Sequence, residues 1–127
     1  PKNAVDLDNS QTWFESYNEQ NAWLKYDFIS RKVRPSYYSI RSRNVAKGYN
    51  HPMNWVIEGS NYDSNDWTIL DTRNNITSLD DSCASQIFSI QKTDTFYRYL
   101  RIRQRGVNSA NLYYLQISVL EYFGAIQ

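Results

Sequence analysis

The sequence predicts an all-β domain, folded as an antiparallel sandwich or barrel. Short segments that alternate apolar and polar residues follow one another along the chain, and loops rich in Asn, Asp, Ser and Gly separate them. No stretch of twelve residues shows the 3.6-residue apolar period of a helix. The 127 residues include 16% aromatic side chains, and each buried aromatic removes about 150–250 Å² from water. We therefore expect residues 1–127 to form a single domain around one core.

The first two expected strands each have an apolar face and a polar face. They are residues 22–28 (AWLKYDF) and 37–43 (YYSIRSR), in which side chains alternate between the two faces of a sheet. The residues expected to point inward are Leu24, Tyr26, Phe28, Tyr38 and Ile40. The residues expected to point outward are Trp23, Lys25, Asp27, Tyr37, Ser39, Arg41 and Arg43.

Three further strands are expected in the middle of the chain, at residues 54–60 (NWVIEGS), 66–70 (DWTIL) and 85–90 (SQIFSI). Each contains β-branched or aromatic residues and is bounded by turn-forming residues. In the first of them, Trp55, Ile57 and Gly59 alternate with Val56, Glu58 and Ser60. We expect Trp55 and Ile57 to face the core.

The last two segments differ in pattern. Residues 96–105 (FYRYLRIRQR) place Leu100 and Ile102 opposite Tyr99, Arg101 and Arg103. Residues 113–123 (YYLQISVLEYF) are nearly continuously apolar, which is typical of a strand that is covered on both faces.

Composition argues against several classes of function. A net charge of +1 gives no basic surplus for nucleic acid, and no run of 18 apolar residues that would span a membrane is present. His51 is the single histidine and precedes an expected strand, where a turn residue is favoured over a catalytic base. With one His and one Cys the chain cannot assemble a zinc site of the usual kind. Because the sequence shows neither a base paired with a nucleophile nor such a metal site, we expect no enzyme.

Cysteine usage predicts the compartment. Cys83 stands alone, so no disulfide can form within the chain. Secreted β-domains of this size often carry a disulfide, so we expect an intracellular, cytoplasmic location.

Seven segments, in their order and spacing, resemble the coagulation factor V/VIII C-type domain, also called the discoidin-like domain. They are AVDLDNSQTWFES, AWLKYDF, RPSYYSIRSR, HPMNWVIEGSN, DWTILD, YRYLRIRQRG and LEYFG. The resemblance covers nearly the whole chain and is closest to an intracellular branch that includes proteins with BTB modules. It implies a galactose-binding-like jelly-roll sandwich of about eight strands without catalytic activity.

The resemblance also implies a strand that precedes Pro1 in relatives. A sheet that lacked it would expose unpaired backbone groups. We expect preceding sequence in a longer natural protein, or a neighbouring chain, to cover that edge.

Many extracellular relatives hold a structural calcium ion, and the matching positions here are Asp6, Asp8 and Thr12. Two departures weaken this site: Leu7 replaces the usual Gly, and Val119 stands where relatives place a ligand Glu. Because calcium needs six to eight oxygen ligands, we expect neither calcium nor another cofactor.

Ligands of the resembled family bind at loops gathered at one end of the sandwich. The matching residues are Trp13, Phe14, Arg43, Asn44, Tyr49, His51, Asn108, Asn111 and Tyr113. Aromatic rings beside Arg, His and Asn suit a sugar, which needs stacking and directed hydrogen bonds. The alternative is that Trp13 or Phe14 packs into the core and the asparagines serve as ordinary turn residues.

The arginines suggest a second kind of site. Arg101, Arg103 and Arg105 share one side of a strand, and Arg41 and Arg43 share one side of another. If these strands were neighbours, the sheet would present a guanidinium patch suited to a protein interface. The alternative is pairing across strands with acidic residues, for which the candidates are Asp27, Glu58 and Glu121.

The sequence thus predicts a non-catalytic domain that docks a partner protein within a larger intracellular protein or assembly. The alternative is a carbohydrate-binding module that uses its loop end, with a glycan as partner. In the docking interpretation, replacing Arg101 and Arg103 by Ala is expected to leave the melting temperature almost unchanged.

Overall fold

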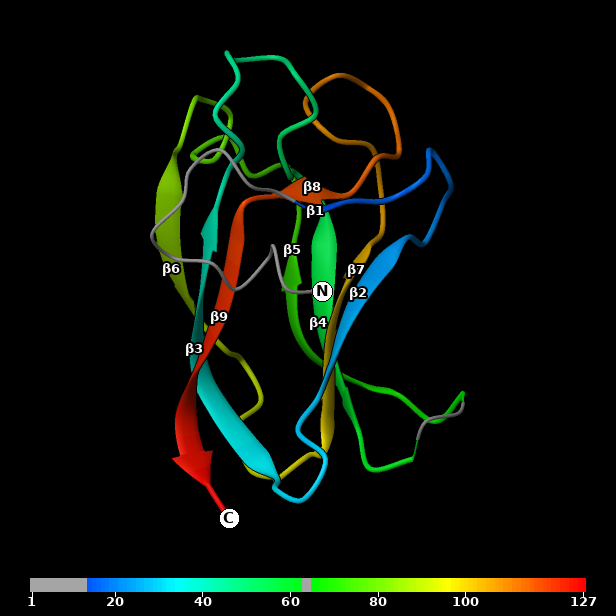
Figure 1. The fold of residues 1–127 in the computed structure, drawn as a ribbon, viewed down its shortest axis with the longest axis vertical. Coiled ribbons are helices and arrows are strands. Elements are labelled where there is room, and N and C mark those ends of the chain that lie inside the picture. Colours follow the sequence, from blue (N-terminus) through cyan, green and yellow to red (C-terminus); the bar gives the residue numbers. More distant parts are fainter. Residues whose placement is uncertain (1–13, 63–64) are drawn as a thin grey trace.

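The computed structural model describes residues 14–62 and 65–127 of the chain (Figure 1). The regular structure of these residues consists of strands that pair antiparallel, which confirms the all-β prediction. The strands are β1 (Phe14–Glu15), β2 (Trp23–Asp27), β3 (Val33–Arg41), β4 (Trp55–Ser60), β5 (Thr68–Arg73), β6 (Ser85–Ser89), β7 (Tyr99–Gln104), β8 (Gln116–Ile117) and β9 (Val119–Ile126).

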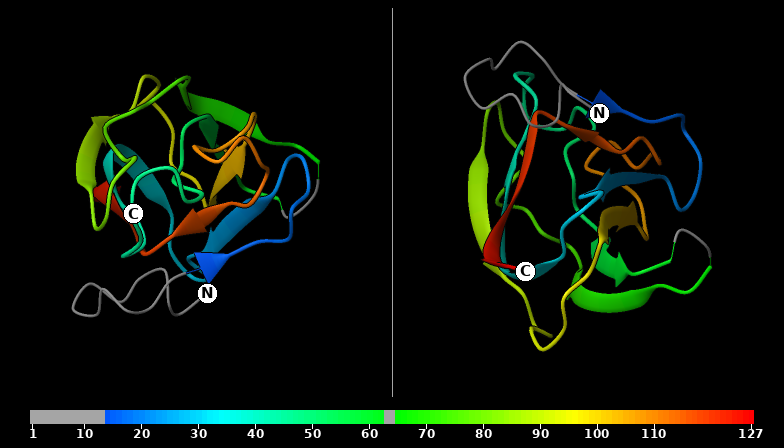
Figure 2. Two further views of the ribbon diagram at one scale, coloured as in Figure 1. Left: turned by 90° about the horizontal axis from the view of Figure 1, so that it is seen from above. Right: turned by 60° about the horizontal axis from the view of Figure 1, so that its bottom comes forward.

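Two sheets face each other and form a sandwich (Figure 1). One sheet has four strands in the order β2-β7-β4-β5, and the other has three strands in the order β6-β3-β9. The pair β1-β8 lies across one end of the sandwich (Figure 1). Residues 42–54 and 105–115, the loops after β3 and β7, lie at the same end, which we call the loop end (Figure 2).

Every expected segment contains a strand, but β3 is longer than expected. It begins at Val33 and runs through Pro35, which cannot donate a backbone hydrogen bond. The proline is tolerated because β6 pairs with β3 only from Tyr37 onward, and the register with β9 shifts between Pro35 and Tyr37. Gly124 lies opposite, where a Cβ atom would collide with the carbonyl oxygen of Arg34. Gly124 therefore permits the close approach of β3 and β9.

The expected core faces are confirmed. Trp55, Ile57, Leu100 and Ile102 of the four-stranded sheet are buried in one cluster. The other sheet contributes further buried side chains to the same cluster, namely Tyr38, Ile40, Phe88 and Leu120. Alternation in the sequence thus gave the correct inward face for these strands.

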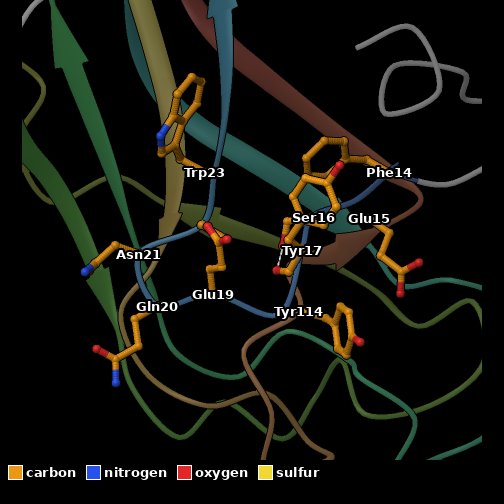
Figure 3. Close-up of a pocket in the computed structure, with 10 residues that line it drawn as sticks. Phe14, Glu15, Ser16, Tyr17, Glu19, Gln20, Asn21, Trp23 and Tyr114 are labelled. Carbon is orange, nitrogen blue, oxygen red and sulfur yellow. Dashed lines mark hydrogen bonds between the residues drawn. The ribbon is translucent and has the colours of Figure 1, made fainter.

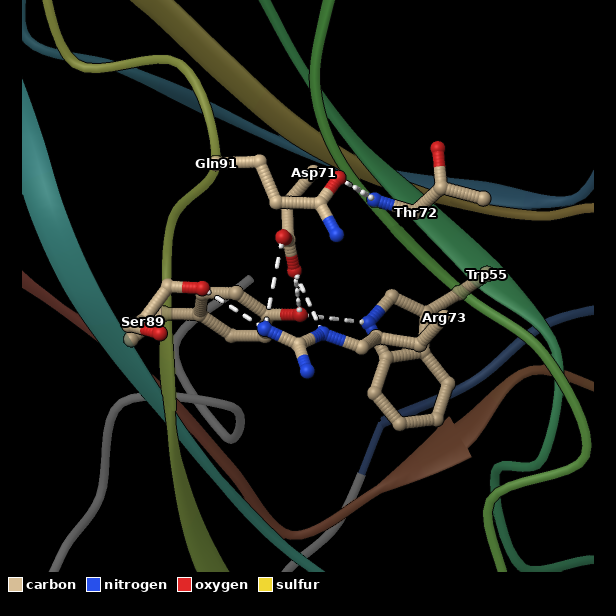
Figure 4. A network of polar contacts seen from close by, with 7 residues as sticks. Trp55, Asp71, Thr72, Arg73, Ser89 and Gln91 are labelled. Carbon is tan, nitrogen blue, oxygen red and sulfur yellow. Dashed lines mark hydrogen bonds and ion pairs between the residues drawn. The ribbon is translucent and has the colours of Figure 1, made fainter.

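A polar network runs through this apolar core and joins the two sheets (Figure 4). The Tyr38 hydroxyl on β3 donates a hydrogen bond of 2.5 Å to Oδ2 of Asp71, a fully buried carboxylate on β5. Nε1 of Trp55 on β4 donates to the Tyr38 hydroxyl oxygen at 3.0 Å. Burial, together with the hydrogen bond to Asp71, raises the pKa of Tyr38, so the phenol remains a donor at neutral pH.

Arg73 completes the network and supplies its positive charge. Its Nε donates to Oδ2 of Asp71 at 2.9 Å, and its Nη2 donates to the carbonyl oxygen of Ser89 on β6 at 2.6 Å. The guanidinium carbon also lies 5.1 Å from the ring centroid of Phe88. The buried carboxylate is therefore paired and hydrogen-bonded, which is the condition for keeping a charge inside a protein.

The expectation that the arginines form one patch is wrong. Arg101 and Arg103 lie on β7 of the four-stranded sheet, whereas Arg41 ends β3 of the three-stranded sheet. Arg43 follows β3 in the loop end, and Arg105 follows β7 and is exposed. The strand order, which no local pattern reveals, separates the two groups.

Trp55→Ala tests the described core. The substitution removes a large buried ring and the donor to Tyr38, so we expect the free energy of unfolding to fall by about 3–5 kcal/mol. Urea denaturation measures the change, with Tyr37→Ala, a half-exposed aromatic of β3, as the control. A midpoint for Trp55→Ala that matches the Tyr37→Ala control would contradict the core assignment.

Candidate functional site

A groove of about 660 Å³ lies beside the loop that connects β1 to β2 (Figure 3). Four aromatic side chains line it: Phe14, Tyr17, Trp23 and Tyr114. Trp23 is 47% exposed and Tyr17 is 83% exposed. Trp23 is held outward because it precedes the buried Leu24 on β2, and neighbouring strand residues point to opposite faces. The groove thus offers large apolar rings to solvent.

Polar side chains also line the groove, and Gln20 and Asn21 extend to the side away from Phe14 and Tyr17 (Figure 3). Glu19, Gln20 and Asn21 form the turn before β2, and the positive φ of 62° at Asn21 is a conformation that Asn tolerates better than most residues. Nε2 of Gln20 donates to the hydroxyl of Tyr113 at 3.3 Å, so its carbonyl oxygen is left to accept. Carboxylate and amide groups in such positions can bond to the hydroxyl groups of a ligand.

Hydrogen bonds to the segment before β8 hold the groove in shape. Ser16 pairs with Leu115 twice: its N–H donates to the Leu115 carbonyl at 2.9 Å, and its hydroxyl accepts from the Leu115 N–H at 2.8 Å. Oδ1 of Asn18 accepts from the N–H of Tyr113 at 2.8 Å. Because these bonds fix the loop backbone, the groove is formed before any ligand arrives.

Two cations of β7 lie next to the groove and share one carboxylate. Nε of Arg101 and Nε of Arg103 donate to Oε1 of Glu58 at 2.8 and 2.9 Å, and Nη2 of Arg103 donates to Oε2 at 3.1 Å. Nη1 of Arg103 also donates to Oδ1 of Asn21, at 2.9 Å. The alternative of pairing across strands with Glu58 is thus confirmed for both arginines.

Glu58 is almost fully enclosed by its partners, with 5% of its side chain exposed. Burial alone would raise the pKa of Glu58, but the hydrogen bonds from Arg103 and Arg101 outweigh it and lower the pKa. The three side chains therefore form an internal brace of the sheet face, rather than a free guanidinium patch.

The structure brings the expected loop residues together at the loop end, but two of them are buried. His51 and Asn108 lie where the two loops join. The N–H of Ser109 donates to the His51 carbonyl at 3.0 Å, and Nδ2 of Asn108 donates to Oδ1 of Asn50 at 2.9 Å. The His51 ring places Nε2 3.0 Å from the carbonyl oxygens of Val45 and Ala46, within its own loop. Because the side chains of His51 and Asn108 are both buried, neither is exposed to a ligand in this structure.

The other expected loop residues have separate positions. Asn44, Tyr49 and Asn111 are exposed, and Arg43 and Tyr113 are half-buried. Phe14 lines the groove but also packs against the core cluster, as the alternative for this residue expected. Tyr113 borders the groove through Gln20. Four candidates lie outside the described residues: Asp6, Asp8, Thr12 and Trp13.

Most of the groove residues were not predicted from the sequence. Trp23 was expected on the outer face, but one exposed aromatic is common on protein surfaces, and only its grouping with other exposed rings marks a binding surface. Tyr17 and Tyr114 carry no comparable signal, because their position depends on how the loop folds back on the segment before β8.

Among residues 14–62 and 65–127, no group of three or more His, Cys, Asp or Glu side chains could hold a metal ion. The same residues contain no helix long and apolar enough to cross a membrane.

No family model and no curated protein matches the sequence. The solved structure of the CBM32 of AlyQ in complex with 4,5-unsaturated mannuronic acid is similar, with a TM-score of 0.72 and 22% identity over 98% of this chain and 85% of that one. The CBM62 from Clostridium thermocellum Xyl5A has a TM-score of 0.71 and 21% identity, over 98% of this chain and 83% of that one.

A third similar structure is the chitosan-binding module 1 from a chitosanase/glucanase of Paenibacillus sp. IK-5. It has a TM-score of 0.66 and 19% identity, over 96% of this chain and 83% of that one. At these identities the likeness concerns the fold. The chain therefore shares the β-sandwich fold of these three structures, whereas the likeness to the factor V/VIII C-type domain stays a prediction.

The brace predicts the effect of removing both arginines. We now expect Arg101→Ala/Arg103→Ala to lower the free energy of unfolding by about 1–3 kcal/mol, because Glu58 would stay buried without a partner. Thermal or urea denaturation measures this, with the exposed Arg105→Ala as a control that changes stability by less than about 0.5 kcal/mol. A double variant as stable as the control would show that the brace contributes nothing.

The lowered pKa of Glu58 predicts a dependence of stability on pH. Since the pKa is lower in the folded protein than the usual 4.5, the contribution of Glu58 is fully present above about pH 4.5 and is lost as the pH falls through the folded value. We expect the stability difference between wild type and Glu58→Gln to shrink between pH 6 and pH 3, as measured by urea denaturation at each pH. Parallel stability curves would rule out this linkage.

Proposed function

We propose that this domain binds a carbohydrate in the groove beside the β1–β2 loop and does not catalyse a reaction. The observation that carries the proposal is the pair of exposed rings, Trp23 and Tyr17, set beside amide and carboxylate groups in a preformed groove. Sugar rings have apolar C–H faces that stack on aromatic rings and hydroxyl groups that need directed partners. Both kinds of partner are present here within one groove.

The fold supports this proposal. Similar structures include a CBM32 solved with 4,5-unsaturated mannuronic acid and another CBM32 solved with GalNAc-β-1,3-galactose. The second has a TM-score of 0.70 and 16% identity. A shared fold does not carry a shared ligand, so the groove of this chain has to supply the argument.

The groove suggests which groups would contact the sugar. Trp23 and Tyr17 both line it, Trp23 from β2 and Tyr17 from the loop before it (Figure 3). Glu19 and the carbonyl oxygen of Gln20 would accept hydrogen bonds from sugar hydroxyls. Because the loop is already ordered by its bonds to Leu115 and Tyr113, binding would cost little backbone entropy.

The described part of the structure does not contain the arginine patch on which protein docking, the main expectation from the sequence, depended. Arg41 lies on the other sheet, and Arg101 and Arg103 are engaged by Glu58. We therefore place carbohydrate binding ahead of protein docking.

Trp23→Ala tests the proposed function. A glycan array with the wild-type domain identifies a ligand, and isothermal titration then compares variants. We expect Trp23→Ala to weaken binding at least tenfold, which corresponds to about 1.4 kcal/mol, because the stacking surface is lost.

The matched control is Tyr37→Ala. Tyr37 is 51% exposed, close to the 47% of Trp23, but it lies on the three-stranded sheet. This variant should bind like wild type. Absence of any glycan binding by the wild-type domain, or equal loss in the two variants, would overturn the proposal.

A further inference from the structure

The outer face of the four-stranded sheet continues from the groove and carries an unusual set of side chains. Cross-strand pairing places Trp23 opposite Arg103, and Lys25 opposite Arg101. Glu58 of β4 lies opposite Arg101 on its other side. We call this surface the arginine face. It carries Trp23, Lys25, Glu58, Arg101 and Arg103.

Arg101 is held between two tryptophans. Its guanidinium carbon lies 4.0 Å from the ring centroid of Trp67 and 5.9 Å from that of Trp23. Its Nε is fixed by Glu58, and its side chain is 17% exposed. Its two terminal amino groups make no hydrogen bond to the part of the chain that the structure describes. A guanidinium fixed in this way presents a planar pair of donors that matches a carboxylate.

Arg101 and Arg103 share one carboxylate, that of Glu58. Because one carboxylate neutralises only one of the two guanidinium charges, the cluster of these three side chains carries one net positive charge. An anion placed at the edge of Arg101 would be attracted by this charge.

The groove and the arginine face are joined by two residues. Trp23 lines the groove and also lies beside Arg101. Asn21 lines the groove, and its Oδ1 accepts from Arg103. A sugar stacked on Trp23 would therefore have its next substituent or its next residue close to the guanidinium of Arg101.

We propose that the arginine face binds the carboxylate of an acidic sugar, in a glycan whose neighbouring residue occupies the groove. This inference rests on the proposed function and names its ligand class: a uronic-acid-containing glycan. The carboxylate oxygens accept hydrogen bonds from the terminal amino groups of Arg101, while Trp23 and Trp67 provide apolar surface on either side of it.

The test compares uronic acid oligosaccharides with the same oligosaccharides after reduction of their carboxyl groups to neutral alcohols. Wild type should bind the acidic form at least tenfold more tightly at low ionic strength, and the difference should shrink as sodium chloride is raised, because salt screens exposed charges. Arg101→Gln should abolish the preference while keeping the affinity for the reduced form.

Two variants complete the design. Arg101→Lys keeps the charge but loses the planar pair of donors, so we expect a reduced preference. Arg34→Gln removes a positive charge from β3 that also stacks on an aromatic ring, 5.2 Å from the centroid of Phe96, and should leave the preference unchanged. Arg101→Gln should still fold, because Arg103 keeps two hydrogen bonds to Glu58; a melting curve checks this.

The outcomes separate the two proposals. Equal affinity of wild type for acidic and reduced oligosaccharides, or a preference that survives Arg101→Gln, overturns the acidic-sugar inference and leaves groove binding intact. Binding of neither form, nor of any other glycan on the array, overturns both. Loss of the preference in Arg34→Gln as well would show a general charge effect and would also overturn the inference.

Discussion

The buried carboxylate of Asp71 is the interaction on which the rest of the sandwich depends. It accepts hydrogen bonds from Tyr38 of one sheet and from Arg73 of its own strand, and Arg73 reaches on to β6. Apolar packing alone would allow the two sheets to slide, because dispersion contacts have little directionality. A charged group without access to water has only one arrangement of partners that avoids a large desolvation cost, so it fixes how the sheets are aligned.

β4 connects this internal network with the outer face. Its Trp55 points inward and donates to Tyr38, while its Glu58 points outward and fixes Arg101 and Arg103. In the pairing with β5, Ile57 lies opposite Asp71 and Glu58 lies opposite Ile69, so the register shifts by one residue between them. This bulge lets Asp71 face the core while Ile69 is exposed. The position of the arginine face is therefore set by the same strand that anchors the core.

The sequence predicted the fold better than the site, and the reason is the range of the information. Alternation along Trp55–Ser60 and Tyr99–Gln104 assigns an inward face without knowledge of any other strand. Whether Arg101 meets Arg41 or Glu58 depends on strand order, which is a non-local property. The burial of His51 and Asn108 likewise depends on two loops that meet across more than fifty residues, so no pattern within either loop reveals it.

The turn at residues 17–20 has a consequence for how this domain can change over evolutionary time. Its backbone is held by the hydrogen bonds of Ser16 to Leu115 and of Asn18 to Tyr113. The side chains of Tyr17 and Glu19 project into solvent and are not part of the core cluster. Substitutions there carry almost no penalty in stability. New ligand preferences can therefore arise by exchange of these few side chains, while the folded framework stays under separate selection.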